Sequence, residues 1–195
     1  MRRVRRMVSL LAAVGLAAGL AAVVVVGDGK PAQAEVIPPS GQWVELFNPQ
    51  EPLTEGRFHV CLDVPSGTSQ DVWIEMWHCH GYDGNGGGQR WTFVHLSSNA
   101  YWIQNVQSHK CLTPGRTETR DPTIWYPWIF QTLCGSADGQ AWTLAPAVGG
   151  FDFFQLRNDS PNYFGKCLDG ESLNGANVGW LDCRSNATSQ TWAFG

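Results

Sequence analysis

The sequence lacks the short motifs that mark many hydrolases and phosphate-binding enzymes. It contains no Gly-x-Ser-x-Gly, no His-Glu-x-x-His and no P-loop. Two carboxylates in one segment, Asp63 and Glu75, are of the type that glycosidases use. A binding role explains both of them, as argued below, so we expect neither catalysis nor a cofactor.

Charged residues are also scarce, at 15% of the 195 residues. The first 34 residues hold five of the 13 basic residues and one of the 17 acidic residues, which leaves 8 basic against 16 acidic residues and a formal charge of −8. Such a surface repels phosphate backbones and anionic membranes. We therefore expect neither nucleic acid nor phospholipid as a partner.

The N-terminus has the three parts of a secretory signal peptide. Four arginines within the first six residues form a basic head, residues 7–26 form an uncharged apolar run, and Ala32-Gln33-Ala34 is a small-residue cleavage pattern. This predicts a signal peptide over 1–34, a linker over 35–41 and a secreted domain over 42–195. The apolar run is long enough to span a bilayer, so an uncleaved membrane anchor is the alternative.

The rest of the sequence is an internal repeat of about 50 residues. Three Gln-x-Trp triplets, which begin at Gln89, Gln140 and Gln190, are 51 and 50 residues apart. In every copy the triplet is preceded, in sequence order, by an alternating segment that ends in asparagine, by a Cys-Leu pair and by a second cysteine. The Cys-Leu pairs begin at Cys61, Cys111 and Cys167, the second cysteines are Cys79, Cys134 and Cys183, and the closing residues are Asn48, Asn105 and Asn158.

Each copy has the pattern of short β-strands. Runs such as residues 73–77 alternate between two faces, Gly, Pro, Asn and Ser clusters separate them, and no long helical period follows the signal peptide. Three copies are too few for a propeller and favour a closed barrel with threefold symmetry. We expect a core formed by large apolar residues that recur in every copy. These are Trp91, Trp142 and Trp192, Leu62, Leu112 and Leu168, and Leu46, Ile103 and Leu156.

Six cysteines behind a signal peptide indicate disulfides. They permit 15 pairings, and the repeat favours one bridge per copy, which pairs Cys61 with Cys79, Cys111 with Cys134, and Cys167 with Cys183. A zinc site at His78-Cys79-His80 is the competing interpretation. That segment lacks a Cys-x-x-Cys partner, so we expect no metal.

This triplicated pattern, including an aromatic residue two positions before the second cysteine in the first copy, resembles the ricin B-type lectin domain over residues 42–195. The resemblance implies an all-β fold, the β-trefoil, with up to one sugar site per copy. In such sites an aromatic ring packs on the C–H face of a pyranose, and a carboxylate accepts hydrogen bonds from its hydroxyls. The resemblance places these groups, in the first copy, at Asp63, Glu75, Trp77 and Gln89, with Gly88 where the family prefers asparagine.

The second copy departs most from the family pattern. Thr113 replaces the acid and Thr132 replaces the aromatic residue, so we expect no site of the family type there. The same copy contains an aromatic cluster at Trp125-Tyr126-Pro127-Trp128, which is either an exposed contact patch or, as we favour, part of the core.

The third copy is intermediate. It keeps Asp169, Asn177 and Gln190, but Leu181 occupies the aromatic position. We expect a secreted lectin that binds galactose- or xylose-type glycans mainly through its first copy. The alternative is a trefoil that has lost sugar binding and acts as a protein-interaction module.

Overall fold

A computed structural model gives the arrangement of residues 36–49, 59–80, 86–115, 127–148, 152–171 and 175–195. The predicted signal peptide over 1–34 lies outside these described residues, as do Trp125 and Tyr126 of the aromatic cluster. Pro127 of that cluster is buried and Trp128 is half-buried. Within the described part, no helix has the length and apolarity that crossing a membrane requires.

The described residues form twelve strands and three short 3-10 helices, with four strands in each copy of the repeat. We refer to the three copies as lobes. The strands of lobe 1 are β1 (Val44–Asn48), β2 (Val60–Asp63), β3 (Glu75–His78) and β4 (Arg90–Ser97). Those of lobe 2 are β5 (Ala100–Asn105), β6 (Lys110–Pro114), β7 (Ile129–Leu133) and β8 (Trp142–Pro146). Those of lobe 3 are β9 (Phe154–Asn158), β10 (Lys166–Gly170), β11 (Ala176–Asp182) and β12 (Ala193–Phe194). The 3-10 helices are Pro65–Gly67, Gly86–Gln89 and Thr188–Gln190.

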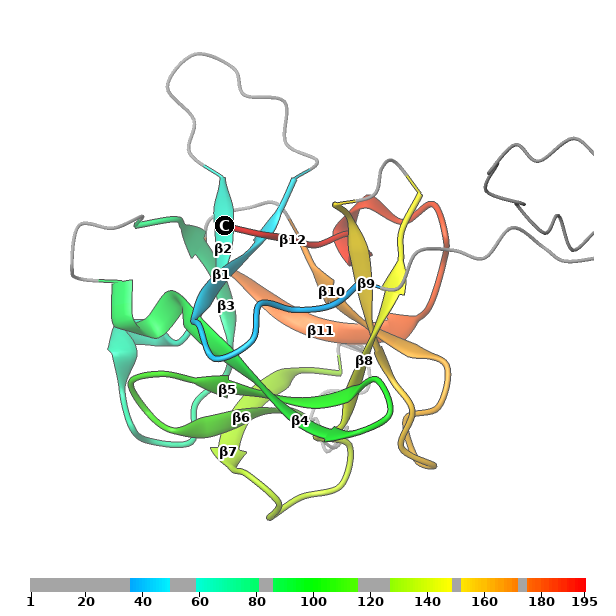
Figure 1. Cartoon of the computed structure of the whole chain (residues 1–195). Coiled ribbons are helices and arrows are strands. Elements are labelled where there is room, and N and C mark those ends of the chain that lie inside the picture. The colour runs from blue at the N-terminus through cyan, green and yellow to red at the C-terminus, as the bar shows by residue number, and fades with distance from the viewer. Residues whose placement is uncertain (1–35, 50–58, 81–85, 116–126, 149–151, 172–174) are drawn as a thin grey trace, which may run out of the picture. The chain divides into compact units, whose positions relative to one another are not determined.

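The first and fourth strands of the lobes close into a barrel (Figure 1). In ring order, β1 pairs with β4, β4 with β5, β5 with β8, and β8 with β9, while β12 returns to β1. A bridge between Phe154 and Trp192 joins the ring between β9 and β12. Ring closure pairs the strand edges that a sheet of short strands would otherwise expose.

The second and third strands of each lobe form a hairpin, and the three hairpins contact one another. The hairpins are β2–β3, β6–β7 and β10–β11. Strand β3 pairs with β11, and bridges join Trp73 to Phe130 and Trp128 to Gly179. A six-stranded barrel with three hairpins in threefold arrangement is the β-trefoil that the family resemblance implies.

The repeated tryptophans lie at the centre of this arrangement, as predicted. Trp91, Trp142 and Trp192 have no exposed surface, and each indole N–H donates to the carbonyl of the Cys-Leu leucine in its own lobe. The Nε1···O distances are 3.0 Å to Leu62, 3.1 Å to Leu112 and 3.2 Å to Leu168. The same indole therefore fills the core and satisfies its one polar group in every lobe. The six predicted aliphatic core residues are also fully buried.

One disulfide in each lobe links the first strand of the hairpin to the residue that follows its second strand, in the predicted pairing. The bridges are Cys61–Cys79, Cys111–Cys134 and Cys167–Cys183, with Cα–Cα separations of 5.0, 4.9 and 5.0 Å. Each closes a loop of about 16 to 23 residues, for which loop-closure entropy gives roughly 3 kcal/mol.

Candidate functional site

In lobe 1, the hairpin presents the predicted acid and indole on one face. Cys61 is opposite Trp77 and Asp63 is opposite Glu75 in the β2–β3 register, and residues that pair directly share a face. The intervening Ile74 and Met76 are fully buried, whereas the Trp77 side chain is 37% exposed. The alternation predicted for residues 73–77 therefore places Glu75 and Trp77 on the solvent side with Asp63.

A small hollow, which we call the lobe-1 hollow, opens beside Asp63. It has a volume of about 210 Å³ and is lined by Asp63, Val64, Ser66, Gly67, His80, Gly88 and Gln107. Glu75 and Trp77 are not among these lining residues. They lie next to the hollow along β3, because Glu75 pairs with Asp63 and Trp77 follows two residues later on the same face.

The carboxyl group of Asp63 is buried, with 8% of the residue exposed. This burial raises its pKa to about 7, the negative charge of Glu75 contributes in the same direction, and a hydrogen bond from Gln89 opposes both. Burial also raises the pKa of Glu75. Near neutral pH, Asp63 therefore exchanges a proton and is available both as carboxylate and as acid.

The glutamine of Gln-x-Trp makes the same bridge in all three lobes. Its Nε2 donates to the carbonyl of the last residue of the third strand, which directly precedes the second cysteine. Its Oε1 accepts from the backbone N–H of the residue that directly follows this cysteine. For Gln89 these partners are His78 O at 2.9 Å and His80 N at 2.8 Å. For Gln190 they are Asp182 O at 3.0 Å and Arg184 N at 2.8 Å. Gln89 and Gln190 have no exposed surface, so this geometry gives them a positioning role.

Gly88 has a structural reason to differ from the asparagine of the family pattern. A Cβ atom at this position would lie 2.6 Å from the carbonyl oxygen of Val64 and 2.9 Å from Oδ1 of Asp63. The carbonyl of Gly88 accepts from the backbone N–H of Val64 at 3.1 Å and from Nδ2 of Asn105 at 2.9 Å. The backbone of Val64 therefore lies too close to Gly88 to leave room for a side chain at this edge of the hollow.

The predicted residues of the third copy do not all come together. Asp169 is 2% exposed and accepts hydrogen bonds from Gln190 and Ser189 at 3.0 and 3.2 Å. Asn177 instead lies opposite Glu75, through the pairing of β11 with β3. Its exposed side chain thus extends the Asp63–Glu75 row of lobe 1. Alignment of each copy with the family pattern on its own cannot show this placement of Asn177, because the placement depends on the register between hairpins of different lobes.

The second copy keeps the scaffold without the acid. Gln140 donates to Oγ1 of Thr113 at 2.9 Å and to the carbonyl of Leu133 at 3.0 Å. Thr113 is 1% exposed and uses its own hydroxyl proton on the carbonyl of Cys111 at 2.8 Å. Thr113 therefore occupies the position of the acid and is held by hydrogen bonds within lobe 2.

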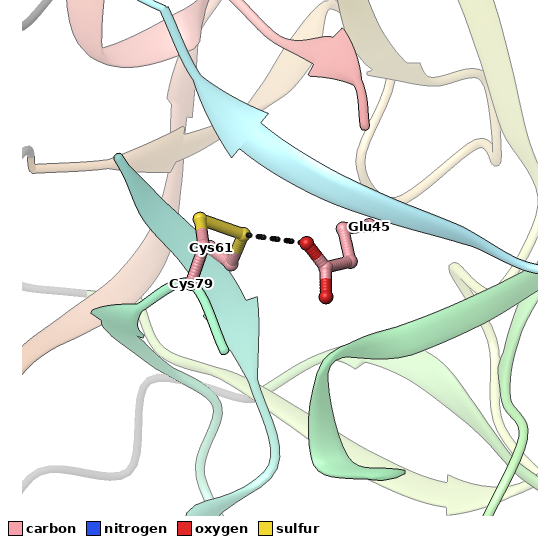
Figure 2. A group of neighbouring side chains, drawn as sticks. All are labelled: Glu45, Cys61 and Cys79. Atoms are coloured by element: carbon pink, nitrogen blue, oxygen red, sulfur yellow. Dashed lines mark hydrogen bonds between the residues drawn. A yellow bond between two sulfur atoms is a disulfide. The ribbon is translucent and has the colours of Figure 1, made fainter. Parts of the chain in front are cut away.

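A cluster of potential metal ligands is explained by a disulfide. Glu45, Cys61 and Cys79 have ligand atoms within 4.8 Å of one another (Figure 2). Oε2 of Glu45 lies 3.8 Å from Sγ of Cys61, but both sulfurs belong to the Cys61–Cys79 bridge. Metal-binding cysteines act as thiolates, so neither this cluster nor His78-Cys79-His80 has a cysteine ligand to offer while the bridge is intact.

Comparisons with known proteins agree with this fold. Residues 87–179 match a family model described as ricin-type beta-trefoil lectin domain-like. No curated protein matches the sequence. Among solved structures, the designed threefold-symmetric protein ThreeFoil is 22% identical with a TM-score of 0.60, and the match covers 78% of this chain and 96% of ThreeFoil.

Two fungal proteins show the same fold. The Macrolepiota procera ricin B-like lectin, solved in complex with lactose, is 18% identical with a TM-score of 0.58, and the match covers 82% of this chain and 98% of the lectin. The Rhizoctonia solani agglutinin is 17% identical with a TM-score of 0.59, with 83% and 98% covered. The chain is thus a β-trefoil, and its residues 87–179 are similar to the ricin-type β-trefoil lectin domain that the triplicated motif resembles.

Proposed function

We propose that this protein is a secreted carbohydrate-binding module whose main site is the Asp63–Glu75–Trp77 face of lobe 1. The observation that carries the proposal is the shared face of a buried acid and a partly exposed indole beside a solvent-open hollow. The indole offers a flat apolar surface to the C–H face of a pyranose, and the acid accepts hydrogen bonds from its hydroxyls. The lactose complex of the Macrolepiota lectin is consistent with a galactose-type ligand.

The polar row in lobe 1 supports sugar over a protein ligand at this site. Asp63, Glu75 and Asn177 are adjacent across three strands, so acceptors and an amide donor lie beside one another next to Trp77. Such a row can accept hydrogen bonds from sugar hydroxyl groups and donate to them. The hollow of about 210 Å³ is small, which favours a single sugar residue or chain end bound weakly, with a Kd in the millimolar to high-micromolar range, or roughly 4 to 6 kcal/mol.

Secretion is the second part of the proposal. Three intact disulfides are typical of proteins that fold in an oxidising compartment, and the N-terminal pattern provides an export signal. N-terminal sequencing of the material recovered outside the cell tests this. A mature protein that starts near Glu35 agrees with the prediction, and an intact N-terminus on membrane-associated protein favours the anchor.

Titration tests the binding proposal. Galactose and xylo-oligosaccharides are titrated into the wild-type protein and into Trp77→Ala by isothermal calorimetry. We expect saturable binding to the wild type and a loss of roughly tenfold or more in the variant, because a stacked aromatic ring contributes about 1–2 kcal/mol. Absence of any signal up to tens of millimolar sugar, across a glycan array as well, would replace the lectin proposal with the protein-interaction module.

A further inference from the structure

One wall of the lobe-1 hollow comes from lobe 2. Gln107 lies in the turn between β5 and β6, and it lines the hollow together with Asp63. All other described residues that line the hollow belong to lobe 1. The family pattern takes its first-copy site residues from that copy alone, between Asp63 and Gln89, so it assigns no role to Gln107.

The side-chain amide of Gln107 occupies a space that two glycines leave open. A Cβ atom at Gly67 would lie 2.6 Å from Oε1 and 2.8 Å from Nε2 of this amide. A Cβ atom at Gly87 would overlap Oε1 as well. Gly67 belongs to the 3-10 helix Pro65–Gly67 and Gly87 to the 3-10 helix Gly86–Gln89. The amide therefore lies between the two segments of lobe 1 that border the hollow.

A buried asparagine holds the turn that carries Gln107. Oδ1 of Asn105 accepts from the backbone N–H groups of Gln107 and Ser108, both at 3.0 Å. Its Nδ2 donates to the carbonyl of Gly88 at 2.9 Å, and Asn105 has no exposed surface. One side chain therefore fixes the turn of lobe 2 against the edge of the hollow in lobe 1, which lowers the cost of ordering this wall when a ligand binds.

A second buried amide, that of Gln131 in β7, ties the same turn to the loop that follows the first 3-10 helix. Nε2 of Gln131 donates to the carbonyls of Thr68 and Gln70 at 2.8 and 2.7 Å, and its Oε1 accepts from Oγ of Ser108 at 2.6 Å. The residues at the equivalent positions, three before the second cysteine, are Met76 in lobe 1 and Trp180 in lobe 3. Lobe 2 thus has a polar side chain where the other lobes have an apolar one, and its bonds connect the two segments that flank the hollow.

The amide of Gln107 is placed to meet a ligand. The residue is exposed, and none of the described residues forms a hydrogen bond with its side chain, since the bond to Asn105 uses the backbone N–H. A glutamine amide has both N–H donors and a carbonyl acceptor, whereas a carboxylate such as that of Asp63 only accepts. Sugar hydroxyl groups donate and accept, so the amide supplies the donors that an ionised acid lacks.

We propose that Gln107 is a sugar contact that lobe 2 supplies to the lobe-1 site, where its amide contributes to the choice between sugars. This inference rests on the proposed binding of carbohydrate at the Asp63–Glu75–Trp77 face. Sugars that differ in one hydroxyl group can stack on Trp77 in the same way, so discrimination between them depends on the polar groups fixed around the hollow. Lobe 2, which has Thr113 in place of the acid, thereby takes part in binding at lobe 1.

The test combines variants of the protein with variants of the sugar. Galactose and xylose are titrated by NMR into the wild type, Gln107→Ala, Gly87→Ala and the double variant, followed by the monodeoxy derivatives of the tighter-binding sugar. Gly87→Ala displaces the amide without removing it, because the atom that its Cβ overlaps is the far end of a flexible side chain. Gln42→Ala is the matched control, since Gln42 is exposed and is not among the described residues that line the hollow. Thermal unfolding establishes that each variant is folded.

We expect Gln107→Ala to weaken binding of the parent sugar roughly three- to tenfold, which is the loss expected for one neutral hydrogen bond. One monodeoxy sugar, which lacks the hydroxyl that the amide contacts, should bind the wild type and Gln107→Ala equally, whereas the others should show the full difference. Gly87→Ala should weaken binding to a similar extent, and the double variant no further than either single variant. Gln42→Ala should bind like the wild type. The side-chain N–H signals of Gln107, identified by their absence from Gln107→Ala, should shift during titration with the parent sugar.

Two results overturn the inference and leave the proposed function intact. One is unchanged affinity in Gln107→Ala when the wild type binds sugar and Trp77→Ala does not. The other is a loss in Gln107→Ala that is the same for every monodeoxy sugar, because such a loss indicates a change in the shape of the site and not a missing contact. Absence of sugar binding by the wild type overturns the proposed function and, with it, this inference.

Discussion

The pH dependence of sugar binding is the most direct consequence of the lobe-1 geometry. Asp63 is buried opposite Glu75, and its pKa is raised to about 7. If Asp63 accepts hydrogen bonds from sugar hydroxyls as a carboxylate, affinity must rise as the pH passes through this value. Lowering the pH from 8.5 to 5 converts the acceptor into a neutral acid without changing the covalent structure.

The size of the effect follows from the two protonation states. With a pKa of about 7, roughly 1% of Asp63 is ionised at pH 5 and nearly all at pH 8.5. Binding through the carboxylate alone would therefore weaken about a hundredfold. A neutral acid still accepts hydrogen bonds, although charge-assisted bonds are stronger by about 1–1.5 kcal/mol. The loss should therefore level off at about tenfold, with its midpoint near pH 7.

Calorimetric titrations of the monosaccharide ligand from pH 5 to pH 9 measure this profile. Asp63→Asn should bind at about the low-pH level of the wild type and show no comparable step. His80→Gln is the control, because His80 is the other ionisable side chain among the described residues that line the lobe-1 hollow. A wild-type profile that is flat over this range, or whose midpoint lies near the ordinary aspartate pKa, would refute the assignment of Asp63 as a charged acceptor in the site.

Further predictions concern the scaffold around this acid. The pKa of Asp63 in the folded protein lies above its ordinary value of 3.8, so the folded state holds the proton more tightly. This contribution to the unfolding free energy is present below pH 4 and is lost as the pH rises through about 7. Urea unfolding at pH 4 and pH 8 measures this loss. Between these pH values the unfolding free energy of the wild type should fall by about 2 kcal/mol more than that of Asp63→Asn; the full pKa shift corresponds to roughly 4 kcal/mol, and water in the hollow reduces it. An equal change in the wild type and in Asp63→Asn would contradict this. Gly88→Asn should lower stability by about 1–3 kcal/mol without improving sugar affinity, because its Cβ would overlap Val64 O; an affinity gain in a thermally stable variant would show that the backbone adjusts. Replacing Cys111 and Cys134 with serine should cost roughly 3 kcal/mol in urea unfolding while sugar binding in lobe 1 persists; loss of that binding in the folded variant would show that the lobes are coupled.

The parts of the structure that recur in every copy could be predicted from the sequence. Each lobe buries the same kinds of side chain in the same positions. These are the tryptophan equivalent to Trp91, its leucine partner and one disulfide. A threefold repetition multiplies the evidence for each position. It also removes the ambiguity of disulfide pairing, since one local bridge per copy is the arrangement that repeats.

The contacts between lobes could not be predicted in the same way. The pairing of Asn177 with Glu75, and of Trp73 with Phe130, depends on the register between hairpins that lie far apart in sequence. Local alternation specifies which face a residue occupies but not which strand lies alongside. The burial of Gln89 and its hydrogen bonds to the backbone of His78 and His80 likewise could not be predicted from its position in the sequence, because they depend on how the loop after β3 folds.

The three lobes separate what maintains the fold from what determines binding. Gln140 makes the glutamine bridge in lobe 2 although its partner is Thr113 and not an acid, so the presence of this glutamine is no evidence for a sugar site. The rows of residues that pair across neighbouring hairpins differ in composition. The row of lobe 1 consists of Asp63, Glu75 and Asn177. The row of lobe 2 consists of Thr113, Phe130 and Trp73. Because two strands of each row belong to one lobe and the third to its neighbour, a substitution in one copy changes the site of another. Ligand preference in this protein should therefore follow the composition of the rows.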